Sequence, residues 1–149
     1  MMDKFDREIL NEIQSDFPIT SRPYKELGER INLSEKDVFE RIERLRLEGV
    51  IRRIGGSFSS NKLNYTSTLC AARVPDEKIE MFVNEVNKFP GVTHNYLRNN
   101  NLNIWFTFIA KDMAYIENAL KQIREKTGVS KIYNLPAVNS FKIKVDFKV

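Results

Sequence analysis

The stretch from residue 91 to residue 110 constrains the fold more than any other part of this 149-residue chain. It reads G-V-T-H-N-Y-L-R-N-N-N-L-N-I-W-F-T-F-I-A. β-Branched and aromatic residues dominate its flanks and an Asn run (99–101) divides them, which predicts two strands joined by a polar turn. Because strand side chains alternate between faces, His94, Tyr96 and Arg98 share one face of the first strand. A histidine, a phenol and a guanidinium side by side suit the binding of an anionic ligand and the transfer of a proton.

Composition is that of a globular protein with one ordinary domain or two small ones. Hydrophobic residues make up 42% and charged residues 30%. The first residues lack the apolar core of a signal peptide, and no apolar run approaches the roughly 18 residues of a membrane span. The single Cys70 has no partner for a disulfide and no companions for a cysteine-based metal site. We therefore expect a cytoplasmic protein without membrane attachment or a metal site of its own.

Residues 1–56 predict a winged helix-turn-helix. Apolar residues recur at helical spacing in a first segment that ends before Phe17-Pro18, and again over about 23–31. A third helix begins at the Ser34 cap and ends at Gly49. Val50–Ile54 would then form the first strand of the wing, followed by a Gly-Gly turn.

The charge of the predicted third helix argues against DNA as its partner. Its first turns carry Glu35, Asp37 and Glu40, which oppose phosphate binding, although Lys36 and Arg41 remain. Residues 1–56 have a net charge of −1, whereas the rest of the chain has +5. We therefore expect this module to be a scaffold that packs, dimerises or shapes its neighbour.

Residues 57–149 predict an α+β domain of the ferredoxin-like type, with the order βαββαβ. Its open sheet face would pair with a second subunit and form a ligand cleft. Besides the hairpin, the predicted elements are a strand over 67–74, a helix from 75–76 onward, a helix over about 112–126, a strand over 130–138 interrupted by Pro136, and a tail strand over 141–149.

Five motifs extend these observations: R-R-I-G-G at 52–56, K-L-N-Y-T-S-T-L-C-A at 62–71, V-P at 74–75, P-G-V-T-H-N-Y-L-R at 90–98 and N-I-W-F-T at 103–107. With them, the whole chain resembles the Lrp/AsnC superfamily and, within it, the siroheme decarboxylases. The resemblance implies a carboxy-lyase that converts siroheme to 12,18-didecarboxysiroheme on a route to haem or haem d1. It also implies an alpha or beta subunit that works with a paralogous subunit in a heterodimer or larger assembly.

The implied reaction assigns roles to the hairpin residues. Loss of CO2 from an acetate arm leaves a carbanion-like carbon that must take a proton. His94 is the candidate acid or, alternatively, an axial ligand to the substrate iron, and Tyr96 is the alternative proton donor. Arg98 suits a carboxylate. The further substrate-binding candidates are Arg52, Arg53, Lys62, Tyr65, Asn95 and Trp105, with Phe106 as another ring contact.

The resemblance requires no cofactor beyond the siroheme iron, which arrives with the substrate, and it leaves haem binding open. Two other functions stay open at this point. The helix-turn-helix pattern is also typical of a transcription regulator that senses a tetrapyrrole or an amino acid. The other alternative is a non-catalytic subunit that binds siroheme but needs its paralogue for turnover.

Overall fold

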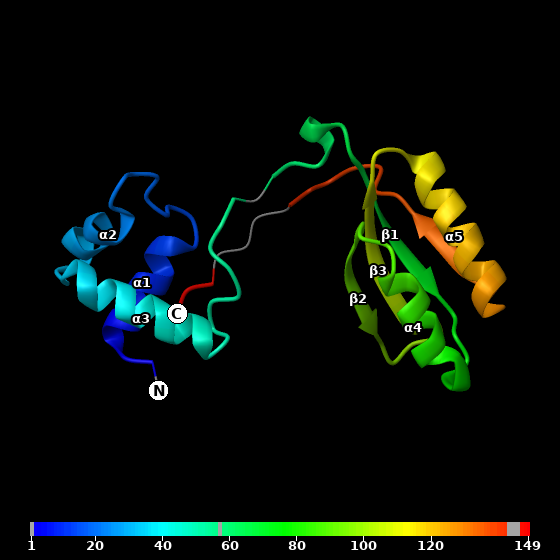
Figure 1. Cartoon of the computed structure of the whole chain (residues 1–149), viewed down its shortest axis with the longest axis horizontal. Helices are drawn as coiled ribbons and strands as arrows, with labels where there is room; N and C mark the ends of the chain where they lie inside the picture. The colour runs from blue at the N-terminus through cyan, green and yellow to red at the C-terminus, as the bar shows by residue number, and fades with distance from the viewer. Residues whose placement is uncertain (1, 57, 143–146) are drawn as a thin grey trace. The chain divides into compact units, whose positions relative to one another are not determined.

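The computed structural model describes residues 2–56, 58–142 and 147–149 (Figure 1). The chain divides into two units. The N-terminal unit comprises residues 1–56 together with 142–149, and the second unit comprises residues 57–141.

Three capped helices build the N-terminal unit: α1 (Lys4–Ile13), α2 (Pro23–Ile31) and α3 (Glu35–Leu47). Asp3 and Asp6 form a capping box at the start of α1, and the Ser34 side chain accepts from Asp37 N at the start of α3. Asn32 ends α2 in the left-handed conformation. The buried core of this unit comprises Ile9, Leu10, Leu27, Val38, Ile42, Leu45 and Ile51.

The predicted wing strand over Val50–Ile54 is wrong. No strand is assigned there in the described part of the N-terminal unit. Ile51 packs into the helical core and its N–H bonds to Leu45 O at 3.1 Å, whereas Arg52, Arg53 and Ile54 are exposed. Ile51 therefore anchors the end of α3, and the segment forms no ladder.

The second unit is a four-stranded antiparallel sheet with two helices, which confirms the ferredoxin-like prediction. The strand order is β2-β3-β1-β4. In chain order the elements are η1 (Asn61–Leu63), β1 (Thr66–Ala72), η2 (Asp76–Lys78), α4 (Ile79–Asn87), β2 (Val92–Leu97), β3 (Ile104–Ala110), α5 (Met113–Thr127) and β4 (Ile132–Leu135).

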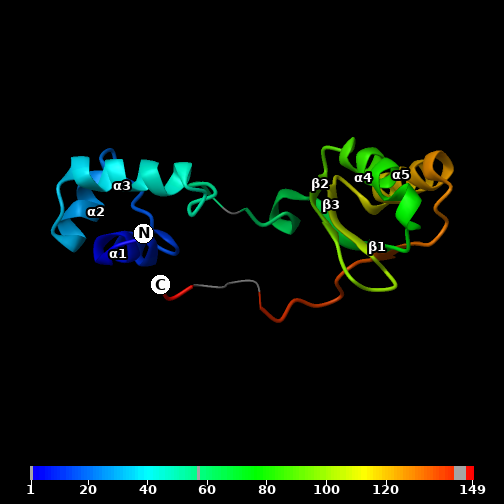
Figure 2. The ribbon, with the colours of Figure 1, turned by 90° about the horizontal axis from the view of Figure 1, so that it is seen from below.

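In the described part of the second unit, helices cover only one face of the sheet. Along β3, Ile104, Phe106 and Phe108 are buried, while the intervening residues Trp105 and Thr107 are half-buried. Figure 2 shows α4 and α5 on the same side of the sheet, where the buried residues lie. Phe106 is fully buried in this core, so its predicted role as a ring contact for a ligand is wrong.

The C-terminal segment departs from the predicted strands. β4 ends at Leu135, immediately before Pro136, because proline cannot donate to a sheet ladder. The predicted tail strand over 141–149 is absent from the described residues of that range, of which 147–149 bond to α1 of the N-terminal unit. Residues 143–146 lie outside the described residues.

A buried carboxylate joins two helices of the N-terminal unit. The Asp6 side chain is 1% exposed and accepts hydrogen bonds from Arg44 at 2.6 Å and Arg41 at 2.8 Å. Burial raises the pKa of Asp6, but the bonds from Arg44, the Asp3 N–H and Arg41 outweigh it and lower that pKa to about 2.

We predict that Asp6→Asn destabilises the chain most at neutral pH. The lowered pKa means that the ionised Asp6 stabilises the folded state fully above its ordinary pKa of 3.8, and that this contribution is lost as the pH falls toward about 2. Discounted for the partial exposure of the arginines, the loss is about 1–2 kcal/mol of the free energy of unfolding. Urea unfolding at pH 7 and pH 2.5 measures it.

Glu29→Gln is the control, because Glu29 forms only an exposed pair with Lys25. Equal losses for Asp6→Asn at both pH values would contradict this account of the buried cluster.

Candidate functional site

His94 and Tyr96 lie on the uncovered face of the sheet. His94 is opposite Thr107 and Tyr96 is opposite Trp105, so the two pairs share the face that the helices leave free. The rings of His94 and Tyr96 are stacked, with centroids 6.0 Å apart and planes inclined by 26°. Both residues are exposed. An imidazole and a phenol therefore lie on the same patch of surface.

A β-bulge in β2 adds a contact that sequence reasoning missed. The register shifts between Val92 and His94, which leaves Thr93 as the extra residue. The Thr93 hydroxyl lies 3.1 Å from Nδ1 of His94. Simple alternation would place Thr93 on the opposite face from His94, and no pattern in the sequence signals the bulge.

Arg98 and Trp105 meet at one end of the hairpin. The Arg98 guanidinium lies over the indole ring, 5.7 Å from its centroid. The indole Nε1–H donates to Leu102 O at 2.6 Å, which fixes the ring against the β2–β3 turn. The Asn103 side chain holds the turn to the end of β1, since it accepts from Val74 N at 2.9 Å and donates to Val74 O at 2.8 Å.

The rest of the uncovered face is mainly apolar. In the strand registers, the row through His94 continues across β3, β1 and β4, and so does the row through Tyr96. These rows place a broad apolar and aromatic surface beside the two polar rings. Beyond β2, the first row comprises Thr107, Leu69 and Leu135, and the second comprises Trp105, Ala71 and Tyr133.

The other predicted site residues lie elsewhere. Asn95 is opposite the buried Phe106, on the helix-covered face, and donates to Asn87 Oδ1 at 3.0 Å; its own Oδ1 is buried and has no hydrogen-bond partner among the described residues. Lys62 and Tyr65 are exposed residues just before β1. The exposed Arg52 and Arg53 belong to the N-terminal unit. The structure therefore brings together His94, Tyr96, Arg98 and Trp105 and separates Asn95 from them.

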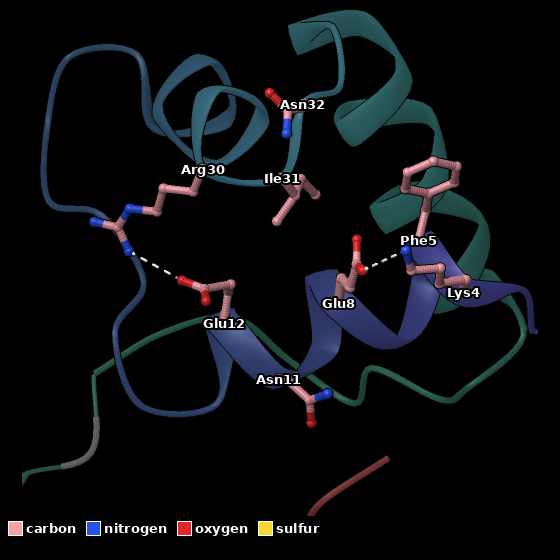
Figure 3. A pocket seen from close by; sticks show the side chains of 8 residues that line it. All are labelled: Lys4, Phe5, Glu8, Asn11, Glu12, Arg30, Ile31 and Asn32. Atoms are coloured by element: carbon pink, nitrogen blue, oxygen red, sulfur yellow. Dashed lines mark hydrogen bonds and ion pairs between the residues drawn. The ribbon is translucent and has the colours of Figure 1, made fainter.

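Each unit has an open pocket. The first, about 470 Å³, lies between α1 and α2 in the N-terminal unit, and Figure 3 shows its Arg30–Glu12 and Lys4–Glu8 pairs. Because these charges balance, the pocket does not favour an anion. The second, about 540 Å³, lies at the end of the sheet near the β2–β3 turn. Its lining residues are Arg73, Val74, Pro75, Asp76, Asn100, Asn101, Asn103, Gly128, Val129, Ser130 and Lys131.

Two other kinds of reactive group, a metal centre and a thiolate, are not found among the described residues. No group of three or more His, Cys, Asp or Glu side chains among them is placed to hold a metal ion. Burial, followed by the nearby Glu117 carboxylate, raises the pKa of the Cys70 thiol to about 12, so it stays protonated. In the described chain no helix combines the length and apolarity needed to cross a membrane.

The basic side chains of α3 are engaged within the N-terminal unit. Each lies beside a carboxylate: Lys36 with Glu40 at 3.7 Å, Arg41 with Asp3 at 2.7 Å, Arg44 with Asp6 at 2.6 Å and Arg46 with Glu43 at 3.1 Å. Phosphate contacts made by this helix would compete with these pairs.

Comparison with known proteins identifies the family of this chain. Residues 6–52 match the model of the siroheme decarboxylase NirDL-like HTH domain, and residues 62–142 match the AsnC-like ligand binding domain. The siroheme decarboxylase alpha subunit of Desulfovibrio desulfuricans is 50% identical over 99% of this chain and 85% of its own length. This chain belongs to the siroheme decarboxylase family.

Solved structures agree with that assignment. The crystal structure of the siroheme decarboxylase NirDL in complex with an iron-uroporphyrin III analogue matches with a TM-score of 0.71 and 31% identity, over 96% of this chain and 48% of that chain. Escherichia coli AsnC matches with a TM-score of 0.82 at 15% identity, over 98% of both chains, and this likeness shows the shared fold alone.

We predict that Gly91→Ala displaces the strand that carries His94. A Cβ at Gly91 would lie 2.1 Å from Ile109 O and 2.9 Å from the Phe108 ring, and Gly91 O also accepts from Ile109 N. The free energy of unfolding should fall by about 1–3 kcal/mol, as for other overpacked sites. Denaturant unfolding of the full chain measures the change.

Gly55→Ala is the matched control, since nothing lies within 4 Å of the added Cβ. Equal stability of the two glycine variants would show that the close approach of β2 to β3 is unimportant.

Proposed function

We propose that this chain is a subunit of siroheme decarboxylase, a carboxy-lyase that removes CO2 from the acetate arms at C12 and C18 of siroheme. The product is 12,18-didecarboxysiroheme, an intermediate in the formation of haem or haem d1. The observation that carries the proposal is the His94–Tyr96–Arg98–Trp105 cluster on the uncovered face of a member of this family.

The cluster suits a planar, polyanionic substrate. Arg98 offers two parallel donors to a carboxylate arm, while Trp105 and Tyr133 offer aromatic surface to the macrocycle. Lys62 and Tyr65, exposed in the same unit, are further proposed contacts, while Arg52 and Arg53 of the N-terminal unit stay predicted anion-binding residues.

Each decarboxylation breaks one C–C bond and forms one C–H bond. The bond between the arm's CH2 and its carboxylate breaks, CO2 leaves, and the electron pair stays on the CH2 carbon in conjugation with the macrocycle. A proton then converts this carbon to a methyl group. An apolar face around the arm favours the loss of CO2, because a desolvated carboxylate loses its stabilising water.

His94 is the proposed proton donor, and Thr93 bears on how it acts. When His94 is the acid, it is an imidazolium with a proton on both ring nitrogens, so Nδ1–H donates to the Thr93 hydroxyl and Nε2–H is the proton to be transferred. When the ring is neutral with its proton on Nδ1, the same bond to Thr93 leaves Nε2 with a lone pair for the substrate iron. Tyr96, stacked on His94, is the alternative donor.

A paralogous subunit is the proposed partner. The apolar sheet face is a natural pairing surface, and the NirDL chain of known structure is about twice the length of its match to this chain. The relatives are themselves called subunits. Activity assays of the assembled enzyme distinguish a catalytic subunit from one that only supports its paralogue.

Anaerobic incubation of the purified chain with siroheme, with and without the paralogue, tests the function. Mass spectrometry of the tetrapyrrole should show the loss of one or two CO2 in the assembled enzyme. An unchanged mass in the complete assembly would contradict the proposal. Salt-sensitive, sequence-specific DNA binding would instead favour the regulator function. The ion pairs of Arg41 and Arg44 with carboxylates of α1 and its cap argue against that function.

We predict that His94→Gln in the assembled enzyme lowers kcat by about 10²–10⁴-fold, the usual contribution of a general acid. The absorption spectrum of the bound siroheme should stay unchanged if His94 is the acid and should shift if it ligates the iron. Single-turnover measurements on the loaded complex give both readouts.

Tyr96→Phe tests the alternative donor, and Tyr115→Phe on α5 is its matched control. Full turnover by His94→Gln would contradict the assignment of His94 as the acid. A large loss of activity in Tyr96→Phe alone would identify Tyr96 as the proton donor.

A further inference from the structure

The last residues of the chain lie against α1 through reciprocal amide hydrogen bonds. Gln14 donates to Phe147 O at 2.7 Å and accepts from Phe147 N at 2.6 Å. Asn11 donates to Val149 O at 3.1 Å and accepts from Val149 N at 3.2 Å. Each side-chain amide thus pairs with both the N–H and the C=O of one residue, as the backbone of a neighbouring strand would.

The spacing of both partners fits this arrangement. Asn11 and Gln14 are three residues apart, so they lie on the same face at the end of α1. Phe147 and Val149 are two apart, so their peptide groups point to the same edge of an extended segment. In Figure 3 Asn11 points away from Ile31 and toward the C-terminal segment.

The contact recognises backbone and not side chains. All four hydrogen bonds end on the peptide groups of Phe147 and Val149, and the Phe147 residue is 71% exposed. Hydrogen bonds to peptide groups do not depend on which side chains the segment carries. The chain's own C terminus is the favoured occupant because covalent attachment raises its local concentration.

We propose that the Asn11–Gln14 face of α1 is a docking site for the C-terminal segment, which straps the N-terminal unit to the end of the chain. The chain passes from the N-terminal unit to the second unit and then returns. With the segment docked, two connections join the units instead of one, which limits their relative freedom. This inference is independent of the decarboxylase proposal.

Hydrogen exchange of the full chain tests the docking. The amide protons of Phe147 and Val149 should exchange about fivefold more slowly than that of Lys148 after correction for intrinsic rates, as expected for one net hydrogen bond each. The double variant Asn11→Ala/Gln14→Ala should abolish this alternation. The exposed Gln122→Ala on α5 should preserve it.

Two results would overturn the proposal. One is an equal exchange rate at residues 147, 148 and 149 in the unmodified chain. The other is protection at residues 147 and 149 that disappears when the unmodified chain is diluted. Docking within one chain does not depend on concentration, so that loss would mean that the segment docks on α1 of a second copy.

The strap also predicts a difference in cleavage between the units. Limited proteolysis at the exposed Phe58, just after the N-terminal unit, should be faster in the double variant than in Gln122→Ala. Equal cleavage rates would contradict a strap even if the amide protection were present.

Discussion

The alternation of side chains along β3 determines how the second unit is built. Ile104, Phe106 and Phe108 point to one side and pack against α4 and α5, where burial of each large apolar side chain contributes about 1.5–3 kcal/mol. Trp105 and Thr107 must then point to the other side. In the described part of the second unit no helix covers that side, where the proposed ligand and partner would bind. The cluster of candidate site residues follows from the same alternation.

Much of this arrangement could be predicted from the sequence. The period-two pattern located β2 and β3, and it correctly placed His94 and Tyr96 on one face. The capping residue Ser34 and the terminal glycine at 128 marked helix ends well, since caps depend on local chemistry. The fold class followed from the order of these elements, each of which carries its own local signal.

The failures have a common physical cause, because they depend on contacts distant in the chain. Residues 141–149 alternate like a half-buried strand, but Asn11 and Gln14 bind the described end of this segment. Val50–Ile54 has strand propensity, yet Ile51 packs into a helical core. The bulge that brings Thr93 to His94 depends on the register with β3. No local pattern encodes any of these three outcomes.

Binding of the tetrapyrrole to the uncovered sheet face can be followed directly at Trp105. It is the only tryptophan of the chain, and its emission overlaps tetrapyrrole absorption. During anaerobic titration with siroheme, the account predicts that Trp105 emission falls in step with the absorbance change of the bound ligand. Arg98→Ala should require more ligand, whereas the exposed Arg7→Ala should not. Saturated binding with unchanged Trp105 emission would contradict the account.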